Sequence, residues 1–430
     1  MVEPQAGEAV VIVGAGSIGL CTAYNLAKHS LAKSPHIVIK VVDAFNQSFA
    51  GPSSNCTGCM HYGFPKPQFP CISLGKYSFD LWATEADDDS FKEATGYRAQ
   101  SSFGIGLGSG RGLEDLPDWV KKDSNWDVNR NVLGASTATV NPIRVGSWLT
   151  EQCRSMGVEI ELDMKIVSVD LSTDNRVQAV TCVNSHQETK TVSCTQLLLA
   201  CGPWTPTVFD TLFPSSPIEL QWTTDAGDWA CWKNPCPTTQ ATTAFVSFAD
   251  MAGEKIEFAG RNDGTIWACG RRNFTANLPP PGDQQEPDEA VIDELAGYAR
   301  KWINWQCNCN SVENQQNNHN SLELVGKGRA FRPATPSGLP IIDKVSPVDL
   351  TANPASCNTS LASGVPNGVF VCWGHGSYGL TLGMGSGRLM SQLMRGEKPD
   401  IDISAFRLGR NDKRVEEKRG DLSGSRCVIL

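Results

Sequence analysis

Residues 10–19 read Val10-Val11-Ile12-Val13-Gly14-Ala15-Gly16-Ser17-Ile18-Gly19, and this stretch decides the fold of the chain. The apolar run predicts a buried strand, and the spacing G-x-G-x-x-G predicts a tight turn that opens a helix. Gly14 permits the turn, Gly16 lets backbone amides approach a ligand, and Gly19 lets the helix pack close to the strand. This is the beginning of a dinucleotide-binding unit.

An acidic residue closes the expected second strand of this unit. Val41-Val42-Asp43 places Asp43 24 residues after Gly19. A carboxylate at this place accepts hydrogen bonds from the adenosine ribose hydroxyls and disfavours a 2′-phosphate. The helix N-terminus offers amides and a positive dipole end to the pyrophosphate. The pattern therefore predicts dinucleotide binding rather than an unrelated glycine-rich turn.

The composition favours small-molecule chemistry. The 430 residues carry a formal charge of −9, and no basic patch is interleaved with aromatic residues, so nucleic acid is not expected as a partner. No apolar run approaches the roughly 20 residues that span a bilayer, and no secretory signal precedes the first strand. We therefore expect a cytoplasmic protein.

The 16 cysteines are expected to be mostly reduced, buried thiols, because a chain of this length builds its own core. Cys56-x-x-Cys59 and Cys307-x-Cys309 lack the second pair of ligands that a zinc site needs, so no metal site is expected. Cys56 and Cys59 are either a redox pair beside a cofactor or ordinary thiols near a turn.

Further apolar segments suggest that the chain returns to the first sheet twice. Residues 196–201 and 369–373 read as buried strands, and a helix is expected from Gly379 to about residue 394. Residues 217–330 alternate in the manner of an antiparallel sheet, with a helix expected over 288–304. A helix is also expected over 77–86, and residues 177–183 and 188–194 read as a hairpin.

Three separated motifs together resemble one family. These motifs are residues 11–19 with 42–45, residues 199–205, and residues 332–342 with Gly374-His375-Gly376. They resemble the D-amino acid oxidase superfamily of FAD-dependent oxidoreductases, which includes glycine and sarcosine oxidases. The resemblance spans residues 8–407 and implies an α/β fold, with a Rossmann-like FAD-binding domain and a discontinuous second substrate domain built on an antiparallel sheet.

The resemblance also implies domain boundaries. The FAD-binding domain would comprise residues 8–75, 140–215 and 329–407. The substrate domain would comprise residues 76–139 and 216–328, and residues 408–430 would form a flexible tail.

The cofactor-binding residues implied by the resemblance fall in the same motifs. They are Gly14, Ala15, Gly16, Ser17, Ile18, Gly19, Asp43, Ala44, Ser53, Ser54, Cys59, Ile166, Gly202, Trp204, Gly374, Gly376, Ser377, Tyr378 and Gly379. The helix that begins near Gly379 would direct its positive end at the flavin pyrimidine, where negative charge gathers on reduction.

Three residues are candidates for catalysis. Arg332 would grip a substrate carboxylate with its guanidinium fork, or it would brace a buried turn. His375 would stand against the flavin ring, or it would be a histidine that caps the helix. Tyr378 would line the same cavity or pack in the core. Trp222, Trp229 and Trp232 would form the floor of the substrate pocket or belong to the core.

The departures from the family pattern bear on the cofactor and the reaction. Ala330 stands where sarcosine oxidases carry a flavin-linked cysteine, so FAD is expected to be bound noncovalently. A lysine that some relatives carry after the Gly-His-Gly unit is absent. The leading hypothesis is an oxidase that takes hydride from a C–H bond next to an amine nitrogen, with oxygen as the second substrate. The alternatives are dehydrogenation or oxidative cyclisation of a secondary metabolite, and a flavin-retaining regulatory protein.

The C-terminal end, Cys427-Val428-Ile429-Leu430, has the form of a geranylgeranylation box. Basic residues precede it, but acidic residues are interspersed, and short endings of this kind also arise by chance. A membrane is expected as a partner only if Cys427 is prenylated.

Overall fold

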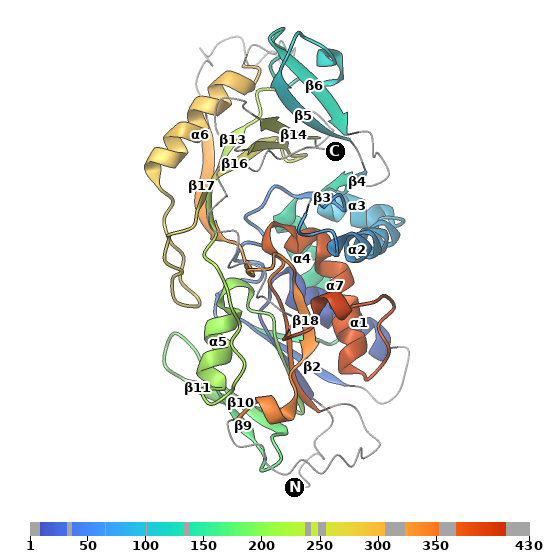
Figure 1. Ribbon diagram of the computed structural model, residues 1–430, viewed down its shortest axis with the longest axis vertical. Helices are drawn as coiled ribbons and strands as arrows, with labels where there is room; N and C mark the ends of the chain where they lie inside the picture. Colours follow the sequence, from blue (N-terminus) through green and yellow to red (C-terminus); the bar gives the residue numbers. More distant parts are fainter. Residues whose placement is uncertain are drawn as a thin grey trace.

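The computed structural model describes residues 9–31, 37–64, 66–99, 101–131, 137–236, 242–247, 255–305, 323–351 and 367–409. Two bodies follow one another along the long axis of the molecule (Figure 1). One is built on a mostly parallel six-stranded sheet, and the other on a mostly antiparallel seven-stranded sheet. The expected α/β fold with a second antiparallel sheet is confirmed.

The six-stranded sheet combines segments from the beginning, middle and end of the chain. Its order is β18-β19-β12-β1-β2-β8, and only the β18–β19 pair is antiparallel. The strands are β1 (Ala9–Val13), β2 (Val38–Val42), β8 (Glu159–Glu161), β12 (Gln196–Leu199), β18 (Ile341–Lys344) and β19 (Gly368–Trp373). β1, β12 and β19 are buried along their whole length, as central parallel strands with both faces covered should be.

Helices α1 (Ser17–Ser30) and α7 (Gly379–Met394) pack tightly against each other beside this sheet. A Cβ atom at Gly387 would lie 2.5 Å from the backbone carbon of Cys21 in α1. A Cβ atom at Gly385 would lie 2.7 Å from Ser78 in α2 (Cys71–Glu85). Each helical glycine costs about 1 kcal/mol relative to alanine, and here the cost is offset because the glycines let three helices meet closely.

The remaining helices of this body complete its core. α3 (Asp89–Thr95) packs on α4 (Pro142–Ser155), and α4 packs on α1. Trp82 and Phe91, from α2 and α3, are fully buried in the same hydrophobic cluster as α1 and α7. The expected helix over 77–86 therefore begins earlier, at Cys71.

The opposite face of the sheet carries a small antiparallel meander and one helix. The meander has the order β11-β10-β9, with β9 (Lys165–Leu171), β10 (Val177–Val183) and β11 (Thr189–Ser193). The β10–β11 pair confirms the expected hairpin. Helix α5 (Thr205–Leu212) packs beside β9.

The seven-stranded sheet has the order β17-β13-β16-β15-β14-β5-β6, in which only the β14–β5 pair is parallel. Its strands are β5 (Ser102–Leu107), β6 (Trp126–Asn131), β13 (Ala226–Lys233), β14 (Thr242–Ser247), β15 (Lys255–Gly260), β16 (Thr265–Asn273) and β17 (Leu324–Phe331). Helix α6 (Glu289–Trp302) covers one face, and Asp288 caps it by accepting a hydrogen bond from Ala290 N.

Residues 76–139, expected to lie together in the substrate domain, divide between the two bodies. Helices α2 and α3 belong to the core of the first body, whereas β5 and β6 form an edge of the second sheet. A three-stranded sheet of β3 (Cys59–His61), β7 (Thr137–Thr139) and β4 (Arg98–Ala99) lies near this junction. The division follows from packing, because α2 packs against α7 and α3 packs against α4 in the first body.

Within the described part of the chain, no helix has the length and apolarity that a membrane crossing requires. The residues of the proposed lipidation box and Cys307 and Cys309 lie outside the described ranges. Free thiols among the described residues include Cys56 and Cys59, whereas Cys236 is disulfide-bonded.

Candidate functional site

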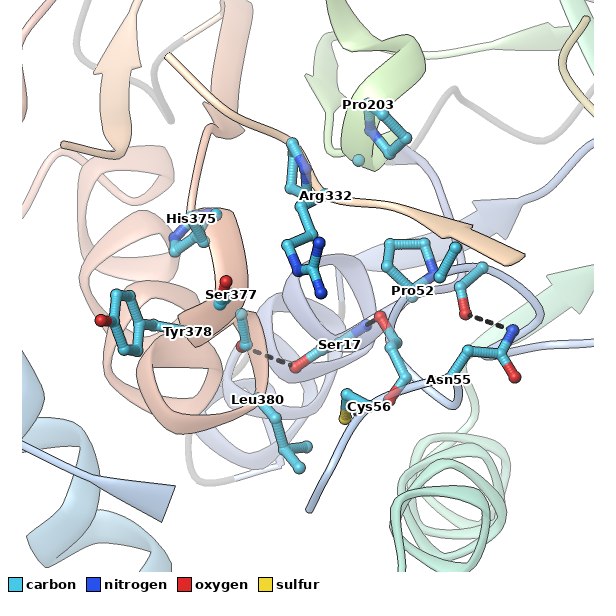
Figure 2. A pocket seen from close by; sticks show the side chains of 18 of the residues that line it. Ser17, Pro52, Asn55, Cys56, Pro203, Arg332, His375, Ser377, Tyr378 and Leu380 are labelled. Carbon is cyan, nitrogen blue, oxygen red and sulfur yellow. Dashed lines mark hydrogen bonds between the residues drawn. The ribbon is translucent and has the colours of Figure 1, made fainter. Parts of the chain in front are cut away.

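One cavity of about 1850 Å³ extends from the glycine turn after β1 to the face of the second sheet opposite α6. It exceeds the roughly 300–1,000 Å³ usual for drug-sized ligands. It is therefore large enough for a dinucleotide together with a second molecule. Figure 2 shows its centre, where Arg332 extends between the turn of His375 and the loop that carries Pro52 and Cys56.

The glycine turn has the geometry that the sequence predicted. Gly14 has φ +112°, and a Cβ atom there would lie 2.3 Å from the carbonyl oxygen of Ala200, which directly follows the neighbouring strand β12. A Cβ atom at Gly19 would lie 1.8 Å from the carbonyl oxygen of Gly14. Gly16 and Ser17 line the cavity, and Ser17 N donates to Ser53 Oγ at 3.0 Å. The N-terminus of α1 thus faces the cavity, where a pyrophosphate fits.

Asp43 lies at the end of β2 and lines the same cavity. Its Oδ2 accepts from Ala15 N at 2.6 Å and its Oδ1 accepts from Phe45 N at 2.8 Å. Burial raises the pKa of this carboxyl group, while the two backbone amides oppose the rise. Each oxygen keeps a second acceptor site, so Asp43 can fix the turn and still receive ribose hydroxyls.

Most of the other expected cofactor residues line the cavity, and the remaining ones lie behind its wall and support it. Those that line the cavity are Ile18, Ala44, Ser53, Cys59, Ile166, Gly202, Trp204, Gly376, Ser377, Tyr378 and Gly379. Among the described residues of these motifs, those outside the lining are Ala15, Gly19, Ser54 and Gly374. Ser54 Oγ donates to Gly51 O, and a Cβ atom at Gly374 would lie 2.5 Å from Thr335. These four residues shape the turns behind the wall.

His375 is buried and bonded to helix α7. Its Nε2 lies 2.9 Å from Ser386 Oγ, and burial lowers the pKa of the imidazole to about 3. The ring is therefore neutral at physiological pH. Its Nδ1 is buried without a hydrogen-bond partner among the described residues. His375 lines the cavity. Its hydrogen bond to Ser386 fixes the turn at the start of α7.

Arg332 follows β17 and is both a brace and a cavity residue. Its Nη1 donates to Asp225 Oδ1 at 3.1 Å, and its backbone N donates to Asp225 O at 2.8 Å. Arg272 also binds Asp225, through Nε at 3.0 Å and Nη2 at 2.5 Å. Asp225 is buried, and its single carboxylate is shared by the two guanidinium groups. The cluster carries a net positive charge, and both arginines line the cavity.

The wall around Tyr378 is aromatic. The Tyr378 ring lies edge-on to Phe64, with centroids 4.7 Å apart, and edge-on to His61 at 5.7 Å. All three residues line the cavity. In Figure 2 the Tyr378 side chain points away from Arg332, so the two occupy different parts of the wall.

The three tryptophans considered from the sequence take different positions. Trp229 lines the cavity, Trp232 is buried in the core beneath α6, and Trp222 is 40% exposed. Trp267 also lines the cavity, stacked on Trp229 with centroids 6.4 Å apart.

Glu257, a carboxylate in the cavity wall, belongs to none of the sequence motifs and was not predicted. Glu257 on β15 pairs with Cys269 on β16, and Cys269 pairs with Trp229 on β13. These three residues therefore share one face of the sheet. The alternation of buried Ile256 and Phe258 around Glu257 is a signal that could have placed its side chain on the face away from α6.

The chain is similar to proteins of known family. The family model described as DAO, FAD dependent oxidoreductase, matches residues 9–393. A proposed oxidoreductase of Schizosaccharomyces pombe is 20% identical over 405 residues, which cover 90% of this chain and 93% of that protein.

Two solved structures share the fold. Glycine oxidase from Geobacillus kaustophilus superposes with a TM-score of 0.66 at 15% identity, covering 94% of this chain and 99% of its own. L-proline dehydrogenase from P. horikoshii gives 0.67 at 12% identity, covering 96% and 99%. The resemblance inferred from the motifs is thereby confirmed. The chain belongs to the DAO family of FAD-dependent oxidoreductases, and FAD is its cofactor.

Proposed function

We propose that this chain oxidises small amino acids or related amines that carry a carboxylate. The observation that carries the proposal is the position of Arg332 in the wall of the cavity that also contains the glycine turn. A guanidinium group binds a carboxylate through two parallel hydrogen bonds. Asp225 engages Nη1 at 3.1 Å, which leaves donors of the same fork for a ligand.

FAD, when bound, supplies the acceptor for a hydride from the C–H bond next to the substrate nitrogen. The contribution of the protein is orientation and electrostatics. Arg332 would hold the carboxylate, and the aromatic residues Trp229, Trp267 and Tyr378 would exclude water. The start of α7 would direct its amides and positive dipole end at the negative charge that develops. The substrate would leave as an imine, and oxygen would accept the electrons to give peroxide.

Reduction under anaerobic conditions tests this function. The yellow holoenzyme is mixed under nitrogen with matched panels of amino acids, amines without a carboxylate, and carboxylic acids without an amine. Bleaching by amino acids, followed by peroxide formation when air is admitted, would support the proposal. Bleaching by none of the amino acids would refute it.

A larger substrate is a second candidate. The cavity volume and the stacked Trp229 and Trp267 favour an aromatic or polycyclic amine over a substrate as small as glycine. An amine of this kind would be an intermediate of a secondary-metabolite pathway, and it would undergo dehydrogenation or oxidative cyclisation. The same anaerobic assay separates the candidates, because only bulky cyclic amines would then bleach the flavin rapidly.

A further inference from the structure

Arg261 is a buried cation that lies one layer behind the wall of the cofactor cavity. It follows β15, and only 7% of its surface is exposed. Its Nη2 donates to Cys56 O at 2.9 Å, and its Cζ atom lies 5.6 Å from the centroid of the Trp267 ring. Cys56 and Trp267 line the cavity, whereas Arg261 is outside the lining. The positive charge therefore lies behind the wall, away from solvent.

The charge of Arg261 has no carboxylate partner among the described residues. Its Nε is buried without a hydrogen-bond partner. Asp263 lies within electrostatic range, but its carboxylate accepts hydrogen bonds from Asn141 and Thr265. Burial lowers the pKa of the Arg261 guanidinium group, yet a guanidinium group stays protonated in proteins. An uncompensated buried charge destabilises a fold, and its field is available to an anion in the cavity.

The flavin end of the cofactor belongs next to the segment that Arg261 holds. Asp43 marks the adenosine end of the cavity, and the N-terminus of α1 faces the place where the pyrophosphate fits. Beyond that place, the wall is formed by Cys56, Thr57 and the start of α7. A dinucleotide bound in this direction would bring its flavin ring to the Cys56–Thr57 peptide.

The hydrogen bond from Arg261 polarises this peptide. A cation bonded to the carbonyl oxygen of a peptide strengthens the N–H of the same peptide as a donor. That N–H belongs to Thr57, and no acceptor for it is found among the described residues. The peptide can therefore carry the effect of the Arg261 charge to a ligand in the cavity.

The surroundings of Arg261 carry an excess of positive charge. Arg261 and Arg332 both act on the same cavity thiol. Arg332 shares the carboxylate of Asp225 with Arg272, and Glu257 supplies the other carboxyl group. Three guanidinium groups thus face two carboxyl groups, and Arg261 supplies the charge that has no counterpart.

We propose that Arg261 stabilises the reduced, anionic form of FAD through the Cys56–Thr57 peptide. Uptake of a hydride brings one proton and two electrons, so the ring gains one negative charge. A fixed positive charge in a site without water lowers the free energy of that anion. Arg261 is a positioning residue, because it acts through Cys56 and Thr57 and does not line the cavity. The inference goes beyond the proposed function, since it concerns the cofactor and holds for any substrate.

The midpoint potential of the flavin in the holoenzyme tests the proposal. Arg261→Gln removes the charge but can still donate to Cys56 O, whereas Arg261→Lys keeps the charge. In Arg261→Gln we expect the preference for reduced over oxidised FAD to fall at least about tenfold, which lowers the potential of a two-electron couple by about 30 mV. Arg261→Lys should stay closer to the parent value. Redox titration against reference dyes measures the potential and needs no substrate.

Sulfite is a second probe, because it is an anion that adds reversibly to the oxidised flavin ring. Its dissociation constant should rise at least about tenfold in Arg261→Gln. Arg395→Gln is a matched control. Arg395 also has a buried Nε without a partner, but it is paired with Glu397 at 2.7 Å and follows α7, outside the cavity lining. This control should leave both the potential and the dissociation constant unchanged.

The proposal is overturned if Arg261→Gln leaves the potential unchanged, if Arg261→Lys lowers it as much, or if Arg395→Gln shifts it equally. Should Arg261→Gln lose its FAD, Arg261→Met takes its place, because methionine fills the site without needing a hydrogen-bond partner. Loss of FAD from both neutral variants would assign Arg261 to bracing the loop and would also overturn the proposal. These measurements involve no substrate, so the proposed function can fail while the role of Arg261 stands.

Discussion

The guanidinium group of Arg332 lies against the backbone of Gly227, where a Cβ atom would sit 2.6 Å from Nη2 and 2.7 Å from Nη1. The absent side chain creates the slot in which the arginine rests. Because Gly227 belongs to β13 and Arg332 follows β17, the neighbouring strand, the slot depends on their antiparallel pairing. The orientation of Arg332 is thus set by a residue with no chemistry of its own.

Filling that slot should disturb substrate binding and spare the cofactor. In Gly227→Ala the new methyl group would displace the guanidinium, so we expect kcat/KM for the best amino acid to fall at least about tenfold. FAD content should not change. Gly297→Ala is a matched control, because Gly297 lies on the exposed side of α6 with no atom near its Cβ position.

Removing the Arg332 side chain tests its role directly. Arg332→Ala should lower kcat/KM by on the order of 10²-fold or more, since a charge-assisted bidentate contact contributes a few kcal/mol. The fold should survive because Arg272 still pairs with Asp225. Steady-state kinetics and the ratio of flavin to protein absorbance are the measurements. Unchanged kinetics, or loss of the flavin, would assign Arg332 to bracing alone.

The neutral, buried His375 should make stability depend on pH. Burial lowers the pKa of the folded imidazole to about 3, from about 6.5 in the unfolded chain. The contribution of His375 to the free energy of unfolding is therefore complete above pH 6.5. This contribution is lost as the pH falls towards 3, by up to about 1.4 kcal/mol per pH unit. Urea unfolding of holoenzyme at pH 7, 5.5 and 4.5 should show this slope.

A histidine elsewhere provides the control for this slope. His375→Gln should flatten it, whereas His186→Gln, at an exposed position, should not. A slope that persists in His375→Gln would attribute the pH dependence to other groups.

The indole of Trp204 should help to retain FAD. Its Nε1 donates to Pro279 O at 2.6 Å and so ties the cavity wall near the glycine turn to the segment after β16. Trp204→Phe removes one hydrogen bond of about 1 kcal/mol, so the Kd for FAD should rise several-fold. Titration of apoprotein with FAD, followed by flavin fluorescence, measures the change. An unaltered Kd would contradict this role.

FAD should leave the protein on denaturation. Ala330 lies within β17 and offers no thiol to the flavin. Acid precipitation should release all of the yellow colour into the supernatant. Colour retained in the pellet would refute noncovalent binding.

Local patterns predicted those elements whose stability is decided within a few residues of sequence. The strand, glycine turn and helix over residues 9–30 have a fixed spacing, and α6 has a capping aspartate and a regular apolar stripe. The start of α2 was predicted too late. Gly75, normally unfavourable in a helix, is needed there because a Cβ atom would lie 2.4 Å from Phe64.

The charged part of the cavity could not be predicted in the same way. The partner of Arg332 lies 107 residues earlier in the chain, and the partner of Glu257 lies 200 residues earlier. Both contacts depend on the register between strands and on how the two bodies meet. Neither is encoded in a local period, so Arg332 was identified only through a family motif and Glu257 was missed.

The hydrogen bond from Ser17 Oγ to Gly379 O, 3.1 Å long, joins the starts of α1 and α7 across 362 residues of sequence. The two sides of the cofactor site are therefore translated 362 residues apart. A nascent chain still on the ribosome has neither β19 in the sheet nor α7 against α1, so its glycine turn lacks half of its support. FAD must accordingly be captured after α7 has been synthesised, and truncation before α7, which spans Gly379–Met394, should yield a colourless protein.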